Sequence, residues 1–521
     1  MVRGRSFFAL LAVAAALGAP QAVSPRKPKL VLAVIIDQFR YDYLLRFRAD
    51  YHGGLARLLD RGADFTDAHY LHAATVTAVG HATFLTGAPP AVSGIIDNEW
   101  FDRATGLKVT SVSDLDTKLV GGTPNPGASP HRLLVSTVGD ELKNVSADSK
   151  VIGVSIKDRA AILPSGHRAD AAYWYDSHSN HWVTSSYYRS ELPAWVKALN
   201  DEKLYQHALS ATWYPVDSQP GTAQPFCTMV PGGNLRYCGS VEATPWSNEM
   251  LEELAERAVI HEDLGKHNGA DILTVSFSAN DYVGHAVGPD DPAVRDLAIR
   301  TDRLLGKLFD VVNQRVGAEN VLVILAADHG VSPMPEYSLA HHMPGGRLSE
   351  DKMKAAILDA LNKRYGAGDW LLPSSIEMPY LNMNLIAQRK LDVAEVERVA
   401  AIAASAQDHI ARVYTGTELR TGLVQQDEIG RAFSLSYNPE RSGNLFILAD
   451  PYYTFYPVLA MHGTPYDYDT HVPVLFMGAG IKPGIYPERI APNDIAPTLS
   501  AILGVAQPSG SIGHVLNEML Q

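Results

Sequence analysis

The chain has 521 residues, of which 46% are hydrophobic and 19% are charged, and its formal net charge at pH 7 is −13. A chain of this length and composition can bury a large core, which excludes a disordered or fibrous protein. The negative charge argues against a nucleic-acid backbone as the main partner, although a local basic pocket in an acidic protein can still bind small anions.

The first element along the chain is typical of a secretory signal peptide. Arg3 and Arg5 precede an apolar run from Phe7 to about Gly18, and small residues follow. We place the cleavage near Ala22, so the signal peptide covers residues 1–22 and the mature chain residues 23–521. The run is shorter than the roughly 20 apolar residues of a membrane helix, and no later segment approaches that length. We therefore expect a periplasmic or secreted protein without a membrane anchor.

Short apolar runs rich in β-branched residues then predict strands that are buried on both faces. The runs are residues 30–36, 151–156, 272–277, 321–326, 445–449 and 472–478. Between them, apolar residues spaced three and four apart predict helices, for example over 251–267 and 291–316. This alternation predicts an α/β fold with a mostly parallel central sheet and helices on both faces.

Two stretches interrupt the alternation, at about 170–245 and 345–430, and we expect both to be insertions that form a cap or subdomain on a single mature domain. The chain's two cysteines, Cys227 and Cys238, lie in the first of them. In an exported protein this spacing favours a local disulfide. The alternative, a metal site, would need further ligands nearby, and the sequence offers none.

Polar side chains stand where the predicted strands end. In open α/β sheets, ligands bind beyond the carboxyl ends of the strands, so these residues are the candidate site. A single acidic residue at such a position usually caps the next helix. Here, however, several strand ends offer metal-binding or anion-binding side chains: Asp37, Lys157 with Arg159, Asp281 with His285, Asp328 with His329, and His471 just before the last run.

Asp281 and His285 are four residues apart, so on one helix their side chains share a face, as two ligands of one ion must. Taken alone, the pair is better explained as a helix cap and a surface histidine. Together with the other carboxylates and imidazoles, it indicates zinc or a similar divalent transition metal, with enough ligands for two ions. Two adjacent ions suit an in-line phosphoryl displacement.

Lys157 and Arg159 are two residues apart, so in an extended segment they would point to the same side. Such a pair of cations would bind a doubly charged phosphate group. An ordinary solvated strand end explains the same residues equally well, and the spacing does not decide between the two.

Seven motifs occur along the chain in this order: IIDQFRYDYL, TVTAVGHATFLTG, GIIDNEW, SIKDRAAI, SANDYVGH, AADHG and YDYDTHVPVLF. Together they resemble the bacterial alkaline phosphatases of the PafA type, in the alkaline phosphatase superfamily. The resemblance runs from about residue 30 to 480 and is specific as a combination, whereas each motif alone is weak. It implies an alkaline phosphatase-like fold, two zinc ions per chain and hydrolysis of phosphate esters.

The resemblance also implies roles for individual residues. Thr77 corresponds to the nucleophile, and the residues that follow it can begin a helix whose free N–H groups face an anion. One zinc would be held by Asp281, His285 and His471, and the other by Asp37, Asp328, His329 and the oxygen of Thr77. The phosphoryl oxygens would be held by Asn98, Lys157 and Arg159.

His462, in MHGTPYD, is the competitor of His471. Related diesterases use a histidine followed by glycine and tyrosine, whereas the DTHVP context favours His471.

Asn98 together with the Lys157 and Arg159 pair is, by the resemblance, typical of monoesterases, because a monoester dianion carries one more negative oxygen than a diester. A sulfatase is disfavoured because Thr77 lacks a C/S-x-P-x-R context. We therefore expect a phosphomonoesterase that acts on small substrates through a phosphothreonine, with a monomer favoured. A phosphodiesterase of the same superfamily and a non-catalytic phosphate-binding protein stay open as alternatives.

Overall fold

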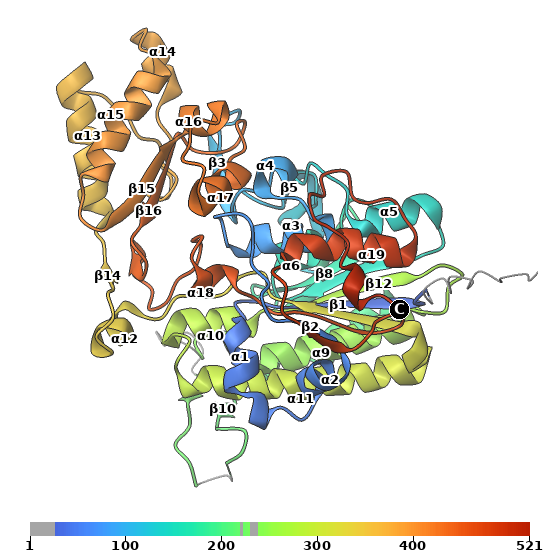
Figure 1. Ribbon diagram of the computed structural model, residues 1–521. Coiled ribbons are helices and arrows are strands. Elements are labelled where there is room, and N and C mark those ends of the chain that lie inside the picture. Colours follow the sequence, from blue (N-terminus) through green and yellow to red (C-terminus); the bar gives the residue numbers. More distant parts are fainter. Residues whose placement is uncertain (1–26, 219–221, 230–237) are drawn as a thin grey trace, which may run out of the picture.

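The computed structural model of the chain describes residues 27–218, 222–229 and 238–521, and it is built around an 11-stranded sheet (Figure 1). The expected signal peptide, residues 1–22, lies outside the described residues. The centre of the sheet is parallel, and its five strands are, in spatial order, β13 (Val321–Ala326), β1 (Leu30–Ile36), β12 (Asp271–Phe277), β7 (Val151–Ser155) and β8 (Ala171–Asp176).

Antiparallel pairs extend this centre on both sides. Next to β13 follow β18 (Val474–Gly478), β2 (Ala63–Phe65) and β19 (Gly484–Tyr486), the last of which pairs with β2 in parallel. Next to β8 follow β9 (His181–Ser185), β5 (Ser113–Val120) and β6 (Pro126–Ala128). The α/β class and the flanking helices are confirmed, and the sheet is mixed, with its parallel part at the centre.

Strand β1 shows why the central runs do not alternate between apolar and polar residues. All seven of its residues are buried. Leu32 and Val34 belong to one apolar cluster, whereas Val31 and Ala33 belong to another on the opposite face. Since successive side chains of a strand point to opposite faces, a strand covered on both faces must be apolar throughout.

Two layers of helices cover the faces of the sheet. One layer contains α1 (Tyr41–Arg46), α2 (Gly54–Arg61), α7 (Ala194–Asp201), α8 (Tyr205–Ala208), α9 (Pro245–His261), α10 (Ala279–Val287) and α11 (Pro292–Val316). The opposite layer contains α3 (Thr77–Thr86), α4 (Pro90–Ser93), α5 (Val138–Val145), α6 (Asp158–Ile162), α17 (Glu428–Ser436) and α19 (Ile495–Leu503).

A separate unit stands to one side of the sheet, at the upper left of Figure 1. It consists of α13 (Glu350–Tyr365), α14 (Met383–Gln388), α15 (Val393–Ser405), β15 (Ile410–Thr415), α16 (Gly416–Thr421) and β16 (Leu445–Ala449). It has an apolar cluster of its own, which includes Ile357, Trp370 and Ile447. The run 445–449, which we expected in the central sheet, pairs instead with β15. This unit therefore continues past residue 430.

The first expected insertion differs from the prediction. β8 and β9 lie within its range, yet they pair with β7 and with each other as part of the main sheet. Tyr173 and Trp174 are buried there, so the aromatic composition that suggested a cap belongs to sheet positions.

The remaining elements are short. Two-stranded pairs are formed by β3 (Glu99–Asp102) with β4 (Leu107–Thr110), β10 (Thr212–Trp213) with β11 (Cys227–Thr228), and β14 (Gly346–Arg347) with β17 (Tyr453–Thr454). The short helices are α12 (Pro335–Ala340) and α18 (Asp467–Thr470), with 3-10 turns at Arg48–Asp50, Ala318–Asn320, Pro492–Asp494 and Asn517–Met519.

Cys227 and Cys238 form the expected disulfide, with Cα atoms 6.2 Å apart. Closing a loop of this size contributes roughly 3 kcal/mol to stability. Within the described ranges, no helix combines the length and the apolar character that crossing a membrane requires.

Candidate active site

The polar residues at the strand ends meet at one edge of the sheet. Asp37 directly follows β1, Asp328 and His329 follow β13, Lys157 follows β7, and Asp281 lies in the first turn of the helix after β12. These four strands are parallel neighbours, so their carboxyl ends lie side by side, as binding at the end of an open sheet requires.

One group of donors consists of Asp37, Asp328 and His329, which are fully buried. His329 Nε2 lies 3.5 Å from Asp37 Oδ1 and 3.5 Å from Asp328 Oδ2. All three atoms lack a hydrogen-bond partner among the described residues. His329 Nδ1 donates to the carbonyl oxygen of Gly330 at 2.9 Å, which leaves the Nε2 lone pair directed at the two carboxylates. Three buried acceptors that face one another fit a divalent metal ion.

The second group consists of Asp281, His285 and His462. Asp281 Oδ1 lies 3.1 Å from His285 Nε2 and 3.6 Å from His462 Nε2. Both histidines donate from Nδ1 to a backbone carbonyl at 2.8 Å, His285 to Ala460 and His462 to Thr75. This arrangement is the one that orients metal-binding histidines. A lone pair on His285 Nε2 would repel the carboxylate oxygen at this distance. Either a proton on Nε2 or a cation bound to both atoms removes that repulsion.

The orientation of the histidine rings divides the donors into two groups, although the ligand atoms of Asp281, His329 and His462 also lie within 4.8 Å of one another. The rings of His329 and His462 are stacked, with centroids 3.5 Å apart and planes at 16°. Because a metal ion lies in the plane of each imidazole that binds it, two stacked rings cannot both direct a lone pair at one ion. The rings of His285 and His462 are tilted by 37° with centroids 5.0 Å apart, which is compatible with a common ion. We call the two groups the Asp37 half-site and the Asp281 half-site.

Burial and charge set the protonation of the donors. Burial raises the pKa of Asp37 well above its usual range, and the neighbouring Asp328 adds to this effect. Burial also opposes ionisation of Asp281, but Lys157 and His285 outweigh it and hold the pKa of Asp281 well below the ordinary value. Burial lowers the pKa of His329 to about 3, so this imidazole is neutral and able to bind a metal at pH 7.

Lys157 joins the two half-sites. Its Nζ lies 2.5 Å from Asp37 Oδ2 and 2.6 Å from Asp281 Oδ2, and it is almost completely buried. Burial alone would lower the pKa of Lys157, but Asp281 and Asp37 raise it above the ordinary lysine value. The ammonium group is therefore charged, and it uses the carboxylate oxygens opposite to those that face the histidines.

Arg159 does not follow Lys157 in an extended segment, as the spacing argument assumed. Lys157 has extended backbone angles, but α6 begins at Asp158, so Arg159 lies in the first turn of a helix. Its side chain is 26% exposed, and its Nε is buried without a hydrogen-bond partner among the described residues. Arg159 is still close enough for its charge to lower the pKa of Lys157.

Thr77 is the first residue of α3 and is buried. Two contacts place the start of this helix between the half-sites. The carbonyl oxygen of Thr75 accepts the hydrogen bond from His462, and Gly80 lies so close to Asp328 that a Cβ on Gly80 would collide with the Asp328 backbone. Asn98 Oδ1 accepts from the N–H of Ala78 at 2.9 Å, which ties Asn98 to the same helix start.

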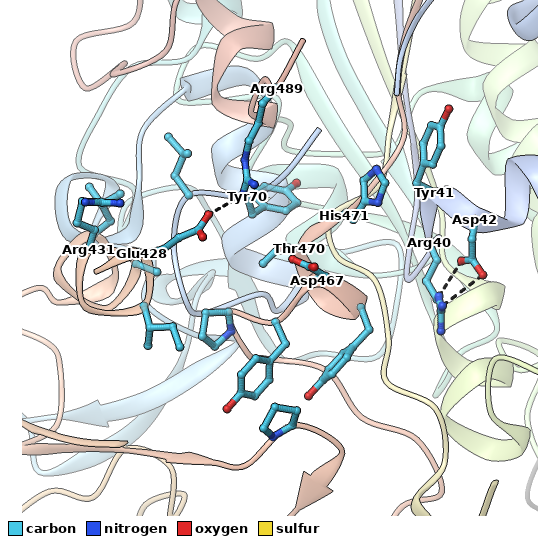
Figure 2. Close-up of a pocket in the computed structure, with 18 of the residues that line it drawn as sticks. Arg40, Tyr41, Asp42, Tyr70, Glu428, Arg431, Asp467, Thr470, His471 and Arg489 are labelled. Atoms are coloured by element: carbon cyan, nitrogen blue, oxygen red, sulfur yellow. Dashed lines mark hydrogen bonds and ion pairs between the residues drawn. The ribbon is translucent and has the colours of Figure 1, made fainter. Parts of the chain in front are cut away.

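His471 was predicted to lie beside Asp281 as a metal ligand, but the structure places His462 there and His471 elsewhere. His471 Nε2 bonds to the carbonyl oxygen of Thr66 at 3.0 Å, and its ring stacks on His69 and Tyr41. Figure 2 shows His471 near Tyr41 on the wall of a cavity of about 850 Å³. None of the six donors of the half-sites lines this cavity.

Asp67, His69 and His471 also bring donor atoms close together. The rings of His69 and His471 are stacked, with centroids 4.5 Å apart and planes at 13°. The two residues face each other across an antiparallel bridge. Both ring nitrogens of His69 have protein partners, Thr470 Oγ1 at 3.1 Å and Asp67 Oδ1 at 2.9 Å.

Asp469, in α18, gives a pH prediction. Its side chain is fully buried, and Oδ2 accepts from the N–H and hydroxyl of Thr464 at 2.9 and 2.6 Å. Burial raises the pKa of Asp469 to about 8. The folded state therefore holds a proton that the unfolded state has lost above pH 4, and stability falls as the pH rises from about 4 to 8.

Asp469→Asn keeps the acceptor and removes this titration. We expect the free energy of unfolding of the variant to fall less between pH 5 and pH 9 than that of the wild type, by at least about 1 kcal/mol. Urea unfolding at both pH values, with chelator in every sample, measures the difference. Equal pH dependence of the two proteins would contradict the raised pKa.

Two residues of the site have no counterpart among the sequence predictions. His81 lies four residues after Thr77; its Nδ1 donates to the Thr77 carbonyl at 2.8 Å and its Nε2 bonds Ser276 Oγ at 2.7 Å. The other residue is Gln38, which directly follows Asp37. The signal for His81 was its position one helical turn after Thr77, and the signal for Gln38 was a polar residue at a buried strand end.

Comparison with known proteins shows which family has this architecture. The sequence profile of the type I phosphodiesterase / nucleotide pyrophosphatase family matches residues 31–469. Alkaline phosphatase PhoV of Synechococcus elongatus is 36% identical, over 96% of this chain and 94% of its own length. Alkaline phosphatase PafA of Elizabethkingia meningoseptica is 32% identical, over 98% of both chains. The crystal structure of wild-type PafA matches with a TM-score of 0.87 at 31% identity, over 95% of this chain and 99% of that chain.

The chain therefore belongs to the type I phosphodiesterase / nucleotide pyrophosphatase family. Within that family it is a homologue of the bacterial alkaline phosphatases PhoV and PafA, which confirms the resemblance that the seven motifs indicated.

Proposed function

We propose that the protein is an exported alkaline phosphatase that hydrolyses phosphate monoesters at a two-zinc site, through a phosphothreonine on Thr77, and releases inorganic phosphate. The observation that carries the proposal is the pair of half-sites, in each of which a carboxylate oxygen lies within 3.6 Å of an imidazole nitrogen. The start of α3 contacts both of them, through the hydrogen bond from His462 to Thr75 and the close approach of Gly80 to Asp328. The near full-length similarity to two alkaline phosphatases supports it.

In this proposal one zinc is held by Asp281, His285 and His462, and the other by Asp37, Asp328 and His329 together with Thr77 Oγ1. Bound zinc lowers the pKa of a hydroxyl group and stabilises negative charge on a departing oxygen.

The protein's own groups position the reaction. Thr77 Oγ1 attacks the phosphorus in line, its bond to phosphorus forms, and the bond from phosphorus to the alcohol oxygen breaks. Ala78 and Gly80 already donate their N–H groups, to Asn98 Oδ1 and to the Val76 carbonyl. The remaining N–H groups of the first turn of α3 would face the phosphoryl oxygens. Water then attacks the phosphothreonine from the side that the alcohol left, which frees phosphate and restores the hydroxyl of Thr77.

The preference for a monoester substrate depends, in this proposal, on the hydrogen bonds and positive charge supplied by Asn98, Lys157 and Arg159. Because Asn98 Oδ1 already accepts from Ala78, the Nδ2 amide is the group that donates to a phosphoryl oxygen. Lys157 and Arg159 supply positive charge to a dianion that has one more negative oxygen than a diester. We propose a small phosphate monoester as substrate and a monomer as the working form.

The test compares hydrolysis of p-nitrophenyl phosphate and bis-p-nitrophenyl phosphate by the purified mature protein, with zinc content measured by elemental analysis. We expect two zinc ions per chain and a strong preference for the monoester. A preference for the diester would make the protein a phosphodiesterase that keeps the metal site. Phosphate binding without turnover of either ester would instead make it a non-catalytic binding protein.

A further inference from the structure

Gln38 occupies an unusual backbone position between the two half-sites. It directly follows Asp37, its side chain is buried, and its φ is +58°, in the left-handed region that residues other than glycine adopt at a cost in free energy. A glycine would adopt this turn without that cost. A glutamine here is therefore expected to contribute through its side chain.

Both ends of Gln38 contact metal-site carboxylates. Its backbone N–H donates to Asp328 Oδ1 at 3.1 Å, in the Asp37 half-site. Its side-chain Nε2 donates to Asp281 Oδ1 at 2.8 Å, in the Asp281 half-site. The left-handed turn is what directs the side chain toward Asp281 while the N–H faces Asp328.

The amide of Gln38 fixes the rotation of the Asp281 carboxylate. Oδ2 of Asp281 is engaged by Lys157, and Oδ1 is the oxygen that faces His285 and His462. A carboxylate held at only one oxygen can rotate about its Cβ–Cγ bond. With Gln38 and Lys157 on opposite oxygens, Oδ1 stays directed at the two imidazoles.

Gly284 keeps the Gln38 amide in place from the other side. It lies on α10 between Asp281 and His285, and a Cβ at this position would collide with Gln38 Oε1. The glycine therefore leaves the space in which the amide reaches Asp281.

We propose that Gln38 is a positioning residue for the Asp281 half-site, which holds the Asp281 carboxylate in its metal-binding orientation through the side-chain amide. The inference rests on the proposed two-ion site. It assigns Gln38 an effect on one ion and not on the other, because only its side chain reaches Asp281, whereas its bond to Asp328 comes from the backbone and survives substitution.

The test measures zinc affinity by competition with a chromophoric chelator for the wild type, Gln38→Met and Gly284→Ala. Methionine has a similar length and no amide donor. Wild-type protein that binds no zinc would refute the two-zinc site itself, before Gln38 is tested. If two zinc ions bind, we expect both variants to weaken one binding step 10- to 100-fold, the range typical of partners that orient metal ligands, and to leave the other step unchanged.

Two control variants show whether the change in zinc affinity belongs to the Asp281 half-site and to the Gln38 amide. His462→Ala removes a ligand of the Asp281 half-site and so identifies the step that belongs to it. Val283→Ala removes a core contact of the same helix, away from Asp281, and reports the effect of a destabilised α10 alone. The proposal is overturned if Gln38→Met weakens both steps equally, weakens neither, or weakens binding no more than Val283→Ala does.

Discussion

Replacing Thr77 by alanine is expected to lower kcat for p-nitrophenyl phosphate by at least a thousand-fold, roughly the loss seen when a nucleophile is removed from a hydrolase. The variant has no hydroxyl to form the covalent phosphoryl intermediate. It keeps Asp37, Asp328 and His329, which supply the buried donors of the adjacent half-site. Two zinc ions per chain should therefore remain. Steady-state kinetics and elemental analysis on the same preparation measure both quantities.

The control is Thr77→Ser, which keeps the hydroxyl and should retain most of the activity. Its intermediate should be trapped by acid quench as phosphoserine, whereas the wild type should yield phosphothreonine. Near-normal kcat in Thr77→Ala would show that the nucleophile is another group, such as water. A loss of one zinc ion in Thr77→Ala would show that Asp37, Asp328 and His329 do not hold that ion without the hydroxyl.

The centre of the fold followed from the sequence because its elements have local signals. Runs such as 30–36 are apolar at every position, and β1 is covered on both faces as this pattern predicts. The run 445–449 carries the same pattern, yet β16 joins a two-stranded sheet. Its composition shows that it is buried but not which core buries it, because the partner of a strand is determined by contacts far away in the sequence.

The same limit, that contacts distant in sequence have no local signal, explains which site residues could be predicted. Asp281 and His285 are one helical turn apart, and Asp328 and His329 are adjacent, so their proximity is local information. The third donor of the Asp281 half-site, His462, comes from a loop more than 170 residues further along the chain. Two histidines competed there, and the DTHVP context favoured His471, which lies beside His69 instead. The hydrogen bond from His462 to Thr75 is a property of the fold alone.

The two histidines give the last prediction. His462→Ala should remove one zinc ion at micromolar free zinc, with affinity reduced by more than about 100-fold, because even residues that only orient a ligand cost 10- to 100-fold. Activity should fall with it, since one of the two ions is lost. His471→Ala should keep both ions and change kcat/KM by less than about ten-fold. Titration against a chelator and kinetics at fixed free zinc measure both effects.

His471→Ala is also the control for losing a half-buried histidine from the same part of the chain. It removes the stacking on His69 and Tyr41, which should cost about 0.5–1.5 kcal/mol of stability for each ring pair and leave the metal ligands in place. The assignment of His462 fails if His471→Ala loses a zinc ion while His462→Ala retains both. In that event the stacking of His329 on His462 would no longer be an argument for two ions. The second metal site would then be assigned to the region of His69 and His471, which face each other across an antiparallel bridge.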